Sequence, residues 1–431
     1  MTDAGLAAWL ARLEQRAPAE RIKLGLERVN AVRDRLKLGL SGAVISVAGT
    51  NGKGSVVAMI ESVALAAGWP VLAYTSPHLH RFEERLRLSG RTLPEAEWIA
   101  ALEAVESARG SVDLSYFEHT TLAALWLGMQ LKARLNVLEV GLGGRLDAVN
   151  CIDPDVAVLT SIGLDHRDWL GPTRLSIARE KLGIARSGRP LIIGERRWPA
   201  GFDKLLDRTG AQAWCLGREI RVRRRSSGGF SLTLPNQPRR KLPQPALVGD
   251  FQIDNAACAL AALARLAPEL GAYWDEGLMR CRLPGRFEII AEAPQVIVDV
   301  AHNTAAARAL ACQLRRQAGP AVAVFAALAD KDITAIARCL ADVFTHWYLP
   351  PLGGPRSVDP RHVAEQLRQA GVAGGVDALE SWGQALELSR ARAGTAGRVV
   401  VFGSFLSVAA AREMIAETIA ETTAESVATA N

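Results

Sequence analysis

The sequence predicts an α/β protein organised around parallel, doubly wound sheets. Short apolar runs without charges alternate with longer helical patterns from residue 43 almost to the end of the chain. Glycine clusters follow several of these runs, at points where a strand gives way to a helix. Buried strands that alternate with helices run parallel, because each helix carries the chain back to the starting edge of the sheet.

The first half of the chain is expected to form the larger sheet. An apolar run from Ala43 to Ala48 ends at a glycine cluster, and an apolar-rich helix over 55–67 follows it and stops at Gly68. The same order returns further along the chain. We expect further strands at 71–74, 136–140, 156–160 and 191–194, and a helix at 122–132.

The stretch from Trp214 to Pro245 has a different character, because arginine, glycine and proline replace the apolar runs. We interpret it as a surface hairpin with loops. Its arginine cluster, Arg221 to Arg225, is most simply a solvated hairpin face, and an anion-binding patch is the alternative. An alanine-rich helix over 255–266 follows, and the breakers Leu283 to Arg286 mark a boundary.

A second, smaller α/β domain is expected after this boundary. Strands are predicted at 296–300, 321–325 and 399–402, and helices at 304–317 and 333–343. A single core rarely exceeds about 250–300 residues, so a chain of 431 residues is expected to divide. We therefore predict an N-terminal domain over 1–287 and a C-terminal domain over 288–431.

Composition restricts the class of protein. Hydrophobic residues make up 49% of the chain, and a formal charge of +6 among 51 basic and 45 acidic residues suggests a preference for anionic ligands, not a polyelectrolyte surface. The six cysteines stand far apart without a C-x-x-C pair, which favours a reducing compartment. The N-terminus lacks a signal-peptide pattern, and no uncharged apolar run approaches the ~18 residues of a membrane span. We expect a cytoplasmic monomer without membrane or nucleic-acid partners.

The segment Gly49 to Ser55 has the composition and position of a phosphate-binding loop. It lies between a buried strand and a helix N-terminus, where backbone N–H groups and the helix dipole face an anion. Lys53 is expected to neutralise phosphate charge, and Ser55 to bind Mg²⁺. The segment departs from G-x-x-x-x-G-K-[ST], since Val47 occupies the first glycine position and Gly54 separates Lys53 from the hydroxyl. An ordinary glycine turn is the alternative, but the flanking strand and helix favour nucleotide binding.

Further polar residues follow the predicted strands, at the edge where ligands collect in open α/β sheets. Glu139 closes one strand, and Asp165 and His166 follow another. Ser76 follows the strand beside the phosphate loop, where an ordinary Ser-Pro turn is the alternative. Hard oxygens and an imidazole suit Mg²⁺ beside phosphates. The strand-end polar groups of the second domain are Arg286, Asp299, His302 and Asp330. The residues alone thus predict a two-domain, ATP-dependent enzyme that uses Mg²⁺.

Taken together, these motifs resemble folylpolyglutamate synthase, which in its bacterial form is bifunctional with dihydrofolate synthase and is related to the Mur-type amide ligases. The matching segments occur in the family's order and cover nearly the whole chain. They are Leu24–Val29, Gly49–Ser55, Thr75–Leu79, Ser115–Glu118, Glu139–Asp147, Leu164–His166, Arg179–Lys181, Leu283–Glu288, Asp299–Asn303, Asp330–Asp332 and Gly403–Phe405. Such an ordered set is far more specific than any one of its members.

The resemblance implies an N-terminal P-loop ATPase domain and a smaller C-terminal Rossmann-like ligase domain, with ATP as co-substrate and two Mg²⁺ ions. By match, the ATP-binding residues are Thr50, Asn51, Gly52, Lys53, Gly54, Ser55, Asn255, Arg286 and Asp299. The expected Mg²⁺ ligands are Ser55, Ser76, Glu139, His166 and Lys181. The pterin substrate is expected to meet Ser115, Tyr116, Phe117, Glu118, Leu146, Asp147 and Ala148, and glutamate to meet His302.

The resemblance also changes the interpretation of Lys181, which by itself is an ordinary lysine on a predicted helix. In the family the matching lysine is carbamylated and becomes an anionic metal ligand. Lys53, Lys181 and His166 are therefore the expected catalytic residues. The chain departs from the family at three positions, and none of them removes a phosphate or metal group. These are Thr304 in place of a frequent proline, Leu406 in place of a histidine, and Lys23 in place of an aspartate.

The expected function is ATP-dependent amide-bond formation through an acyl phosphate, in which L-glutamate is joined to dihydropteroate and to the γ-carboxylate of reduced folates. A monofunctional folylpolyglutamate synthase is the nearest alternative. An alternative from another class is a basic, nucleic-acid-binding ATPase that uses Arg221 to Arg225. The absence of aromatic residues between these arginines argues against it.

Overall fold

The computed structural model describes residues 5–18 and 23–429, with side chains up to Thr418. They form two compact units, which we describe separately. Unit 1 comprises the chain up to Ala246 together with Asp250–Arg282, and unit 2 comprises Leu247–Gly249 and the chain from Leu283 onward. The main change of unit thus falls among the predicted breakers, and a domain boundary at 287/288 stays a prediction.

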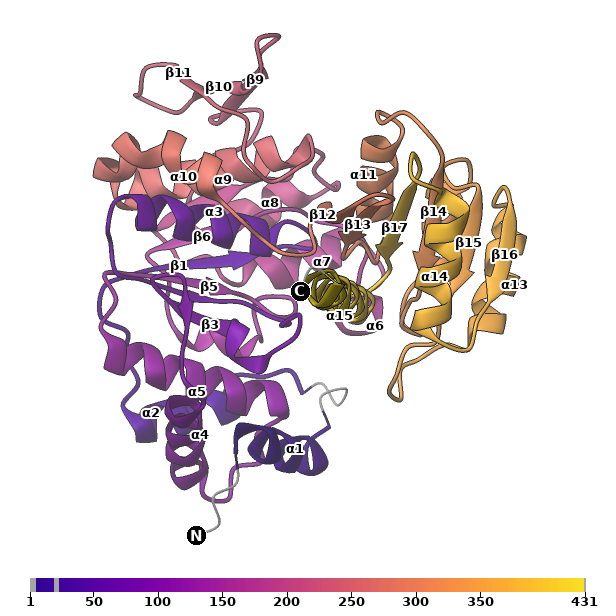
Figure 1. The fold of residues 1–431 in the computed structure, drawn as a ribbon. Helices are drawn as coiled ribbons and strands as arrows, with labels where there is room; N and C mark the ends of the chain where they lie inside the picture. The colour runs from indigo at the N-terminus through magenta and orange to yellow at the C-terminus, as the bar shows by residue number, and fades with distance from the viewer. Residues whose placement is uncertain (1–4, 19–22, 430–431) are drawn as a thin grey trace. The chain divides into compact units, whose positions relative to one another are not determined.

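Unit 1 is built on an eight-stranded sheet (Figure 1). Its strands are β1 (Ala43–Ala48), β2 (Val71–Tyr74), β3 (Leu86–Leu88), β4 (Arg91–Thr92), β5 (Leu135–Glu139), β6 (Val156–Leu159), β7 (Pro190–Ile193) and β8 (Gln212–Cys215). Their order is β4-β3-β2-β5-β1-β6-β7-β8, and the antiparallel pairings are β2 with β3 and β3 with β4, at one edge. The predicted α/β class with a mainly parallel sheet is confirmed.

Helices cover both faces of this sheet (Figure 1). Helix α3 (Lys53–Ala66) packs with α9 (Phe251–Leu266) and α10 (Trp274–Arg280) on one face. The other face carries α1 (Leu6–Arg16), α2 (Glu27–Leu36), α4 (Glu95–Arg109) and α5 (Tyr116–Leu131). The shorter helices are α6 (Arg167–Leu170), α7 (Arg174–Leu182), α8 (Phe202–Asp207), η1 (Phe82–Arg85), η2 (Ala148–Cys151) and η3 (Pro268–Tyr273).

Helix α5 begins well before the predicted start at residue 122. The reason is a capping box, in which Ser115 Oγ accepts from the Glu118 N–H and the Glu118 carboxylate accepts from the Ser115 N–H. These two bonds satisfy backbone donors that a helix end leaves unpaired. The polar first turn, which the apolar pattern did not include, is therefore helical.

The arginine-rich stretch forms a small antiparallel sheet, as the predicted hairpin requires. It contains β9 (Arg221–Arg224), β10 (Phe230–Thr233) and β11 (Arg240–Leu242), in the order β11-β10-β9. Between Leu216 and Ala246 the chain has eight basic residues and one acidic residue, whereas its total formal charge is +6. The positive surplus of the chain therefore lies in this small sheet and the loops next to its strands.

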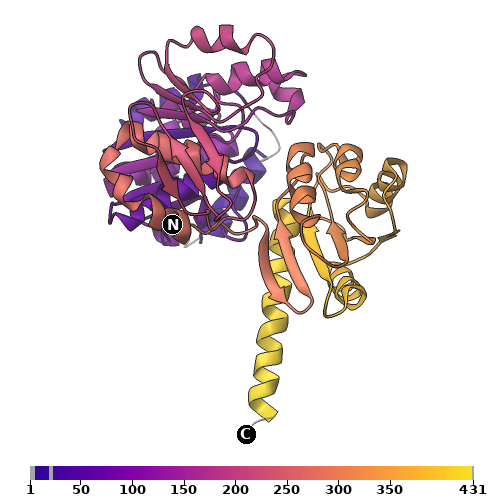
Figure 2. The same cartoon turned by 90° about the horizontal axis from the view of Figure 1, so that it is seen from above.

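Unit 2 contains a six-stranded sheet in the order β12-β13-β17-β14-β15-β16, in which only β12 is antiparallel. Its strands are β12 (Glu288–Glu292), β13 (Gln295–Asp299), β14 (Ala321–Phe325), β15 (His346–Leu349), β16 (Gly375–Ala378) and β17 (Arg398–Phe402). Its helices are α11 (Thr304–Leu314), α12 (Ile333–Leu340), α13 (Pro360–Ala370), α14 (Trp382–Ala393) and α15 (Phe405–Thr429). Helix α15 packs against β12, β13 and β17 and then extends beyond the sheet (Figure 2).

None of the helices in the described part of the chain combines the length and the apolar character that a membrane span requires.

Candidate active site

The phosphate loop, Gly49 to Gly52, joins β1 to α3 and is anchored on the chain that leaves β6. The Asn51 N–H donates to Ser161 Oγ at 2.9 Å, and Thr160 Oγ1 donates to the Asn51 carbonyl at 2.6 Å. Gly49 lies so close to Thr160 that a Cβ there would be 1.8 Å from Oγ1. The loop is therefore held in one shape at the N-terminus of a 14-residue helix, where N–H groups and the helix dipole attract anions.

Thr50 and Lys53 are also bound to backbone groups of the loop region. Thr50 Oγ1 accepts from the Gly163 N–H at 2.9 Å and donates to the Gly163 carbonyl at 3.2 Å. Lys53 Nζ donates to the Gly49 carbonyl at 3.1 Å, and Gly54 follows it in the first turn of α3. The hydrogen bond thus holds the Lys53 side chain beside the loop.

Gly52 is a second position where this loop tolerates little change. Its φ of 88° lies in the left-handed region, and a Cβ there would be 2.5 Å from Asn255 Oδ1. We expect Gly52→Ala to lower the free energy of unfolding by about 1–3 kcal/mol, because the added methyl group strains the backbone. It should also weaken ADP binding, because the methyl group displaces the Asn255 side-chain amide from the loop. Thermal unfolding and titration calorimetry measure the two effects.

Gly68→Ala is the matched control, because Gly68 also has a positive φ but has open space around its Cβ position. We expect this control to lose stability without losing ADP affinity. An equal loss of ADP affinity in both variants would contradict the role assigned to Gly52.

Adjacent parallel strands bring other predicted residues to the same end of the sheet, where the strands have their C-termini. Strand β5 places Glu139 beside Val47 of β1, and Glu139 is buried. Ser76 follows β2, the neighbour of β5 on its other side, and is half-buried. His166 follows β6 and precedes α6, and its N–H donates to Asp165 Oδ1 at 3.0 Å. The topology thus places Ser76, Glu139 and His166 after the C-terminal ends of neighbouring strands, at the end of the sheet where the phosphate loop lies.

Lys181 is a buried lysine, with 4% of its surface exposed, in the last turn of α7. Burial and, after it, the positive charge of Lys53 lower its pKa to about 7, while the carboxylates of Asp165 and Asp147 act in the opposite direction. The structure therefore brings Lys181 into the electrostatic reach of the phosphate loop. The interpretation of Lys181 as an ordinary surface lysine is wrong, because α7 turns it inward.

The glycine stretch after β5 packs against the C-terminus of α7. A Cβ at Gly144 would lie 2.9 Å from the Lys181 carbonyl oxygen, so only glycine allows this approach. Asp147 braces the same loop, because its carboxylate accepts from the Leu142 N–H at 2.7 Å and from the Val149 N–H at 3.0 Å. Burial raises the pKa of Asp147 to about 6. The structure thus gives Asp147 a structural role, and its contact with a substrate stays a prediction.

The residues predicted to meet the pterin lie around the start of α5 and the loop before η2, whose first residue, Ala148, is buried. Glu118 is buried and forms an ion pair with Arg28 at 2.7 Å. The Leu146 carbonyl accepts from the Gly25 N–H at 3.3 Å, so a third segment joins the group. A Cβ at Gly141 would lie 2.5 Å from the Phe117 ring. Three separate segments therefore converge in unit 1.

Two of these contacts come from residues that were absent from the predicted substrate set. Arg28 and Gly25 both belong to the segment Leu24–Val29, whose resemblance to the family was the only signal in the sequence. Next to them, the pKa of Tyr116 is raised by burial, and the guanidinium of Arg85 lies 5.8 Å from its ring. Contacts between residues that are far apart in the sequence leave no local pattern from which they could be predicted.

The three predicted residues of unit 2 lie around the end of β13. The Asp299 carboxylate accepts from the Phe287 N–H and the Ala301 N–H, both at 2.8 Å. Burial raises the pKa of Asp299, while the charge of Arg286 and a smaller effect of His302 oppose that rise. The guanidinium of Arg286 lies 5.3 Å from the Phe405 ring. Arg286, Asp299 and His302 are thus neighbours within unit 2.

The donor set in unit 1 fits a hard divalent cation. Among the described residues, no three histidine, cysteine, aspartate or glutamate side chains form a group that could hold a metal by themselves. The predicted set instead combines the hydroxyls of Ser55 and Ser76 and the carboxylate of Glu139 with His166 and a carbamylated Lys181. Such oxygen donors suit Mg²⁺, which keeps water and phosphate oxygens among its ligands.

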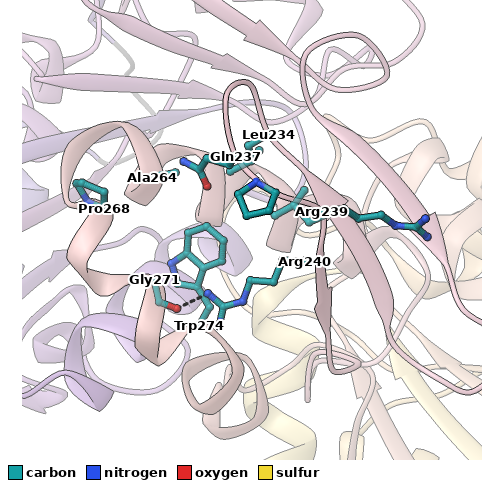
Figure 3. Close-up of a pocket in the computed structure, with 10 residues that line it drawn as sticks. Leu234, Gln237, Arg239, Arg240, Ala264, Pro268, Gly271 and Trp274 are labelled. Carbon is teal, nitrogen blue, oxygen red and sulfur yellow. Dashed lines mark hydrogen bonds between the residues drawn. The ribbon is translucent and has the colours of Figure 1, made fainter.

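A cavity of about 330 Å³ lies elsewhere in unit 1, beneath the small sheet (Figure 3). Arg240 crosses its wall, where it donates to the Gly271 carbonyl and lies over the Trp274 ring. Arg239 points its guanidinium away from the cavity and donates to Ser231 Oγ at 3.1 Å. None of the predicted site residues lines this cavity. It belongs to the packing of the small sheet.

Comparison with known proteins identifies the family. The Mur ligase middle domain matches residues 47–263, and the Mur ligase, glutamate ligase domain matches residues 285–405. The dihydrofolate synthase/folylpolyglutamate synthase of Escherichia coli (strain K12) is 42% identical over 426 residues, which cover 95% of each chain. The chain belongs to the dihydrofolate synthase/folylpolyglutamate synthase family of Mur ligases.

Solved structures resemble this Mur ligase over almost its full length. Escherichia coli FolC in complex with DHPP and ADP has a TM-score of 0.91 at 42% identity and covers 96% of this chain and 99% of its own. A bifunctional folylpolyglutamate synthase/dihydrofolate synthase with Mn, AMPPNP and L-glutamate bound has a TM-score of 0.86 at 39% identity, over 96% and 98%. The resemblance inferred from the motifs is confirmed.

Proposed function

We propose that this chain is a bifunctional, ATP-dependent amide ligase. It joins L-glutamate to dihydropteroate, which yields dihydrofolate, and to the γ-carboxylate of reduced folates, which extends their polyglutamate tail. The observation that carries the proposal is the C-terminal end of the unit 1 sheet, where Glu139 lies beside β1 and the buried Lys181 lies within reach of the Lys53 charge. The 42% identity to a bifunctional relative favours two activities over a monofunctional folylpolyglutamate synthase.

The reaction consists of two transfers. A carboxylate oxygen of the acceptor attacks the γ-phosphorus of ATP, which releases ADP and leaves an acyl phosphate. The amine of glutamate then attacks the acyl carbon, loses a proton and expels phosphate. Phosphoryl transfer needs little covalent help from a protein, so the chain acts mainly by positioning reactants and neutralising charge. The loop amides and Lys53 perform this task at the phosphates.

The remaining residues are assigned by their place in each unit. Mg²⁺ offsets phosphate charge when it is bound, and the residues that would hold it are Ser55, Ser76, Glu139, His166 and a carbamylated Lys181. In unit 1, the segments Ser115–Glu118 and Leu146–Ala148 receive the acceptor, and Asn255 contacts the nucleotide. In unit 2, Arg286 and Asp299 contact the nucleotide, and His302 orients glutamate.

The ligation assay tests this function. With ATP, Mg²⁺, L-glutamate and dihydropteroate all present, we expect ADP release together with a product heavier than dihydropteroate by one glutamyl residue, identified by mass spectrometry. Omitting glutamate or the acceptor is the control and should reduce ADP release to background. A complete mixture that releases no ADP would refute the function. Activity on a reduced folate but not on dihydropteroate would indicate the monofunctional alternative.

We also propose a cytoplasmic location for the enzyme. All six cysteines are free thiols, and four of them are buried. Unpaired thiols are typical of reducing compartments. The monomeric state stays a prediction from the sequence.

A further inference from the structure

Gln252 connects helix α9 to the phosphate-binding helix α3. It lies in the first turn of α9 and is completely buried. Its Nε2 donates to Ser55 Oγ at 3.3 Å, and its Oε1 accepts from Asn255 Nδ2 at 2.9 Å. Both polar atoms of this buried amide are therefore satisfied inside the protein, as buried polar groups require.

The two bonds give the Gln252 amide one orientation. Because Asn255 donates to the oxygen, the nitrogen of Gln252 faces Ser55 and acts as a donor. Asn255 is itself held against the phosphate loop, since its Oδ1 lies 2.5 Å from the position that a Cβ on Gly52 would occupy. A continuous path of contacts thus runs from the loop through two amides to the hydroxyl of Ser55.

The bond from Gln252 limits what the Ser55 hydroxyl can do. A serine hydroxyl has one proton and two lone pairs, and the Gln252 N–H occupies one lone pair. Ser55 is 3% exposed, so its hydroxyl has few other partners to choose from. One lone pair remains for a cation, and the proton remains for an anionic oxygen. Without Gln252, the hydroxyl would be free to rotate away from this arrangement.

We propose that Gln252 is a positioning residue, which holds the Ser55 hydroxyl in the orientation that accepts a divalent cation beside the nucleotide phosphates. This inference rests on the proposed function. Gln252 acts through Ser55 and needs no contact with substrate. Its spacing from Asn255, one helical turn along α9, gives both side chains the same helix face.

Nucleotide binding measured with and without metal tests the proposal independently of turnover. Titration calorimetry of ADP, in Mg²⁺ and in a chelator, gives the metal-dependent gain in affinity. We expect Gln252→Met to reduce this gain by about tenfold, because a hydrogen bond next to a charged group is lost, while metal-free ADP affinity stays within about twofold. Gln252→Asn keeps the amide but is too short to reach Ser55, and it should show the same loss.

A double-variant cycle shows whether Gln252 acts through Ser55. If it does, Ser55→Ala combined with Gln252→Met loses no more metal dependence than Ser55→Ala alone. Ser62→Ala is the matched control, because Ser62 lies on the same helix and its Oγ donates to the Gly277 carbonyl at 2.8 Å. This control should retain the full metal-dependent gain.

Each remaining outcome has a distinct meaning. A full metal-dependent gain in both folded Gln252 variants would overturn the inference, and so would an equal loss of affinity with and without Mg²⁺. Thermal unfolding of each variant verifies that it is folded. If the unmodified protein shows no gain from Mg²⁺, the metal-dependent function itself is wrong, and this inference is wrong with it.

Discussion

Lys53→Ala is expected to lower the rate of ADP release by roughly 10²–10³-fold, the usual effect of removing one preorganised charge-stabilising group. Lys53 Nζ lies 3.1 Å from the Gly49 carbonyl, which keeps its charge at the loop where the phosphates of ATP bind in the proposed function. Phosphoryl transfer depends on neutralising this charge. The rate is measured as steady-state ADP formation with saturating acceptor, glutamate and Mg²⁺.

Lys204→Ala is the control for this experiment, because Lys204 is an exposed lysine on α8. Surface substitutions of this kind change stability by less than about 0.5 kcal/mol, so its rate should match that of the unmodified enzyme. Full activity in Lys53→Ala would remove the phosphate loop from the mechanism.

Lys181→Ala is expected to reduce turnover by a comparable factor, roughly 10²–10³-fold, with partial recovery when acetate or formate is added. Burial and the nearby charge of Lys53 lower the pKa of Lys181 to about 7, so a large share of the amine is neutral near neutral pH. A neutral amine attacks the carbon of CO₂, a C–N bond forms, and one proton leaves. The product is the carbamate that the family resemblance implies.

A small carboxylate can replace this carbamate because both offer two oxygens with one negative charge. Recovery should therefore occur with acetate or formate and not with chloride at the same ionic strength. If Lys181→Ala turns over as fast as the unmodified enzyme, the carbamate interpretation is wrong.

In buffer freed of CO₂, Lys181 should also make the stability of the unmodified enzyme depend on pH. The pKa of Lys181 is about 7 in the folded chain and near 10.5 when exposed, so the unfolded chain binds more protons between these values. The free energy of unfolding should therefore rise with pH from about 7 toward about 10.5. Lys181→Ala should remove this rise, which denaturant titrations at several pH values would measure. An unchanged slope would mean that another group causes it.

The pattern of apolar runs predicted the central strands of both sheets but missed strands in unit 2. Strand β16 forms one edge of that sheet and is largely exposed, so it lacks a continuous apolar run. Strand β15 is buried but has only four residues, beginning with His346. Short strands and edge strands depend on their neighbours for pairing, which periodicity along the chain does not record.

The sequence by itself determined the phosphate loop, the strand-end carboxylate Glu139 and the family, because each depends on residues that are close together along the chain or on the order of such motifs. Only the tertiary structure decided that Lys181 is buried within reach of the Lys53 charge and that the Gln252 amide donates to Ser55. The physical reason is that burial, pKa and hydrogen-bond orientation arise from contacts between distant segments, and a local pattern contains no information about those contacts.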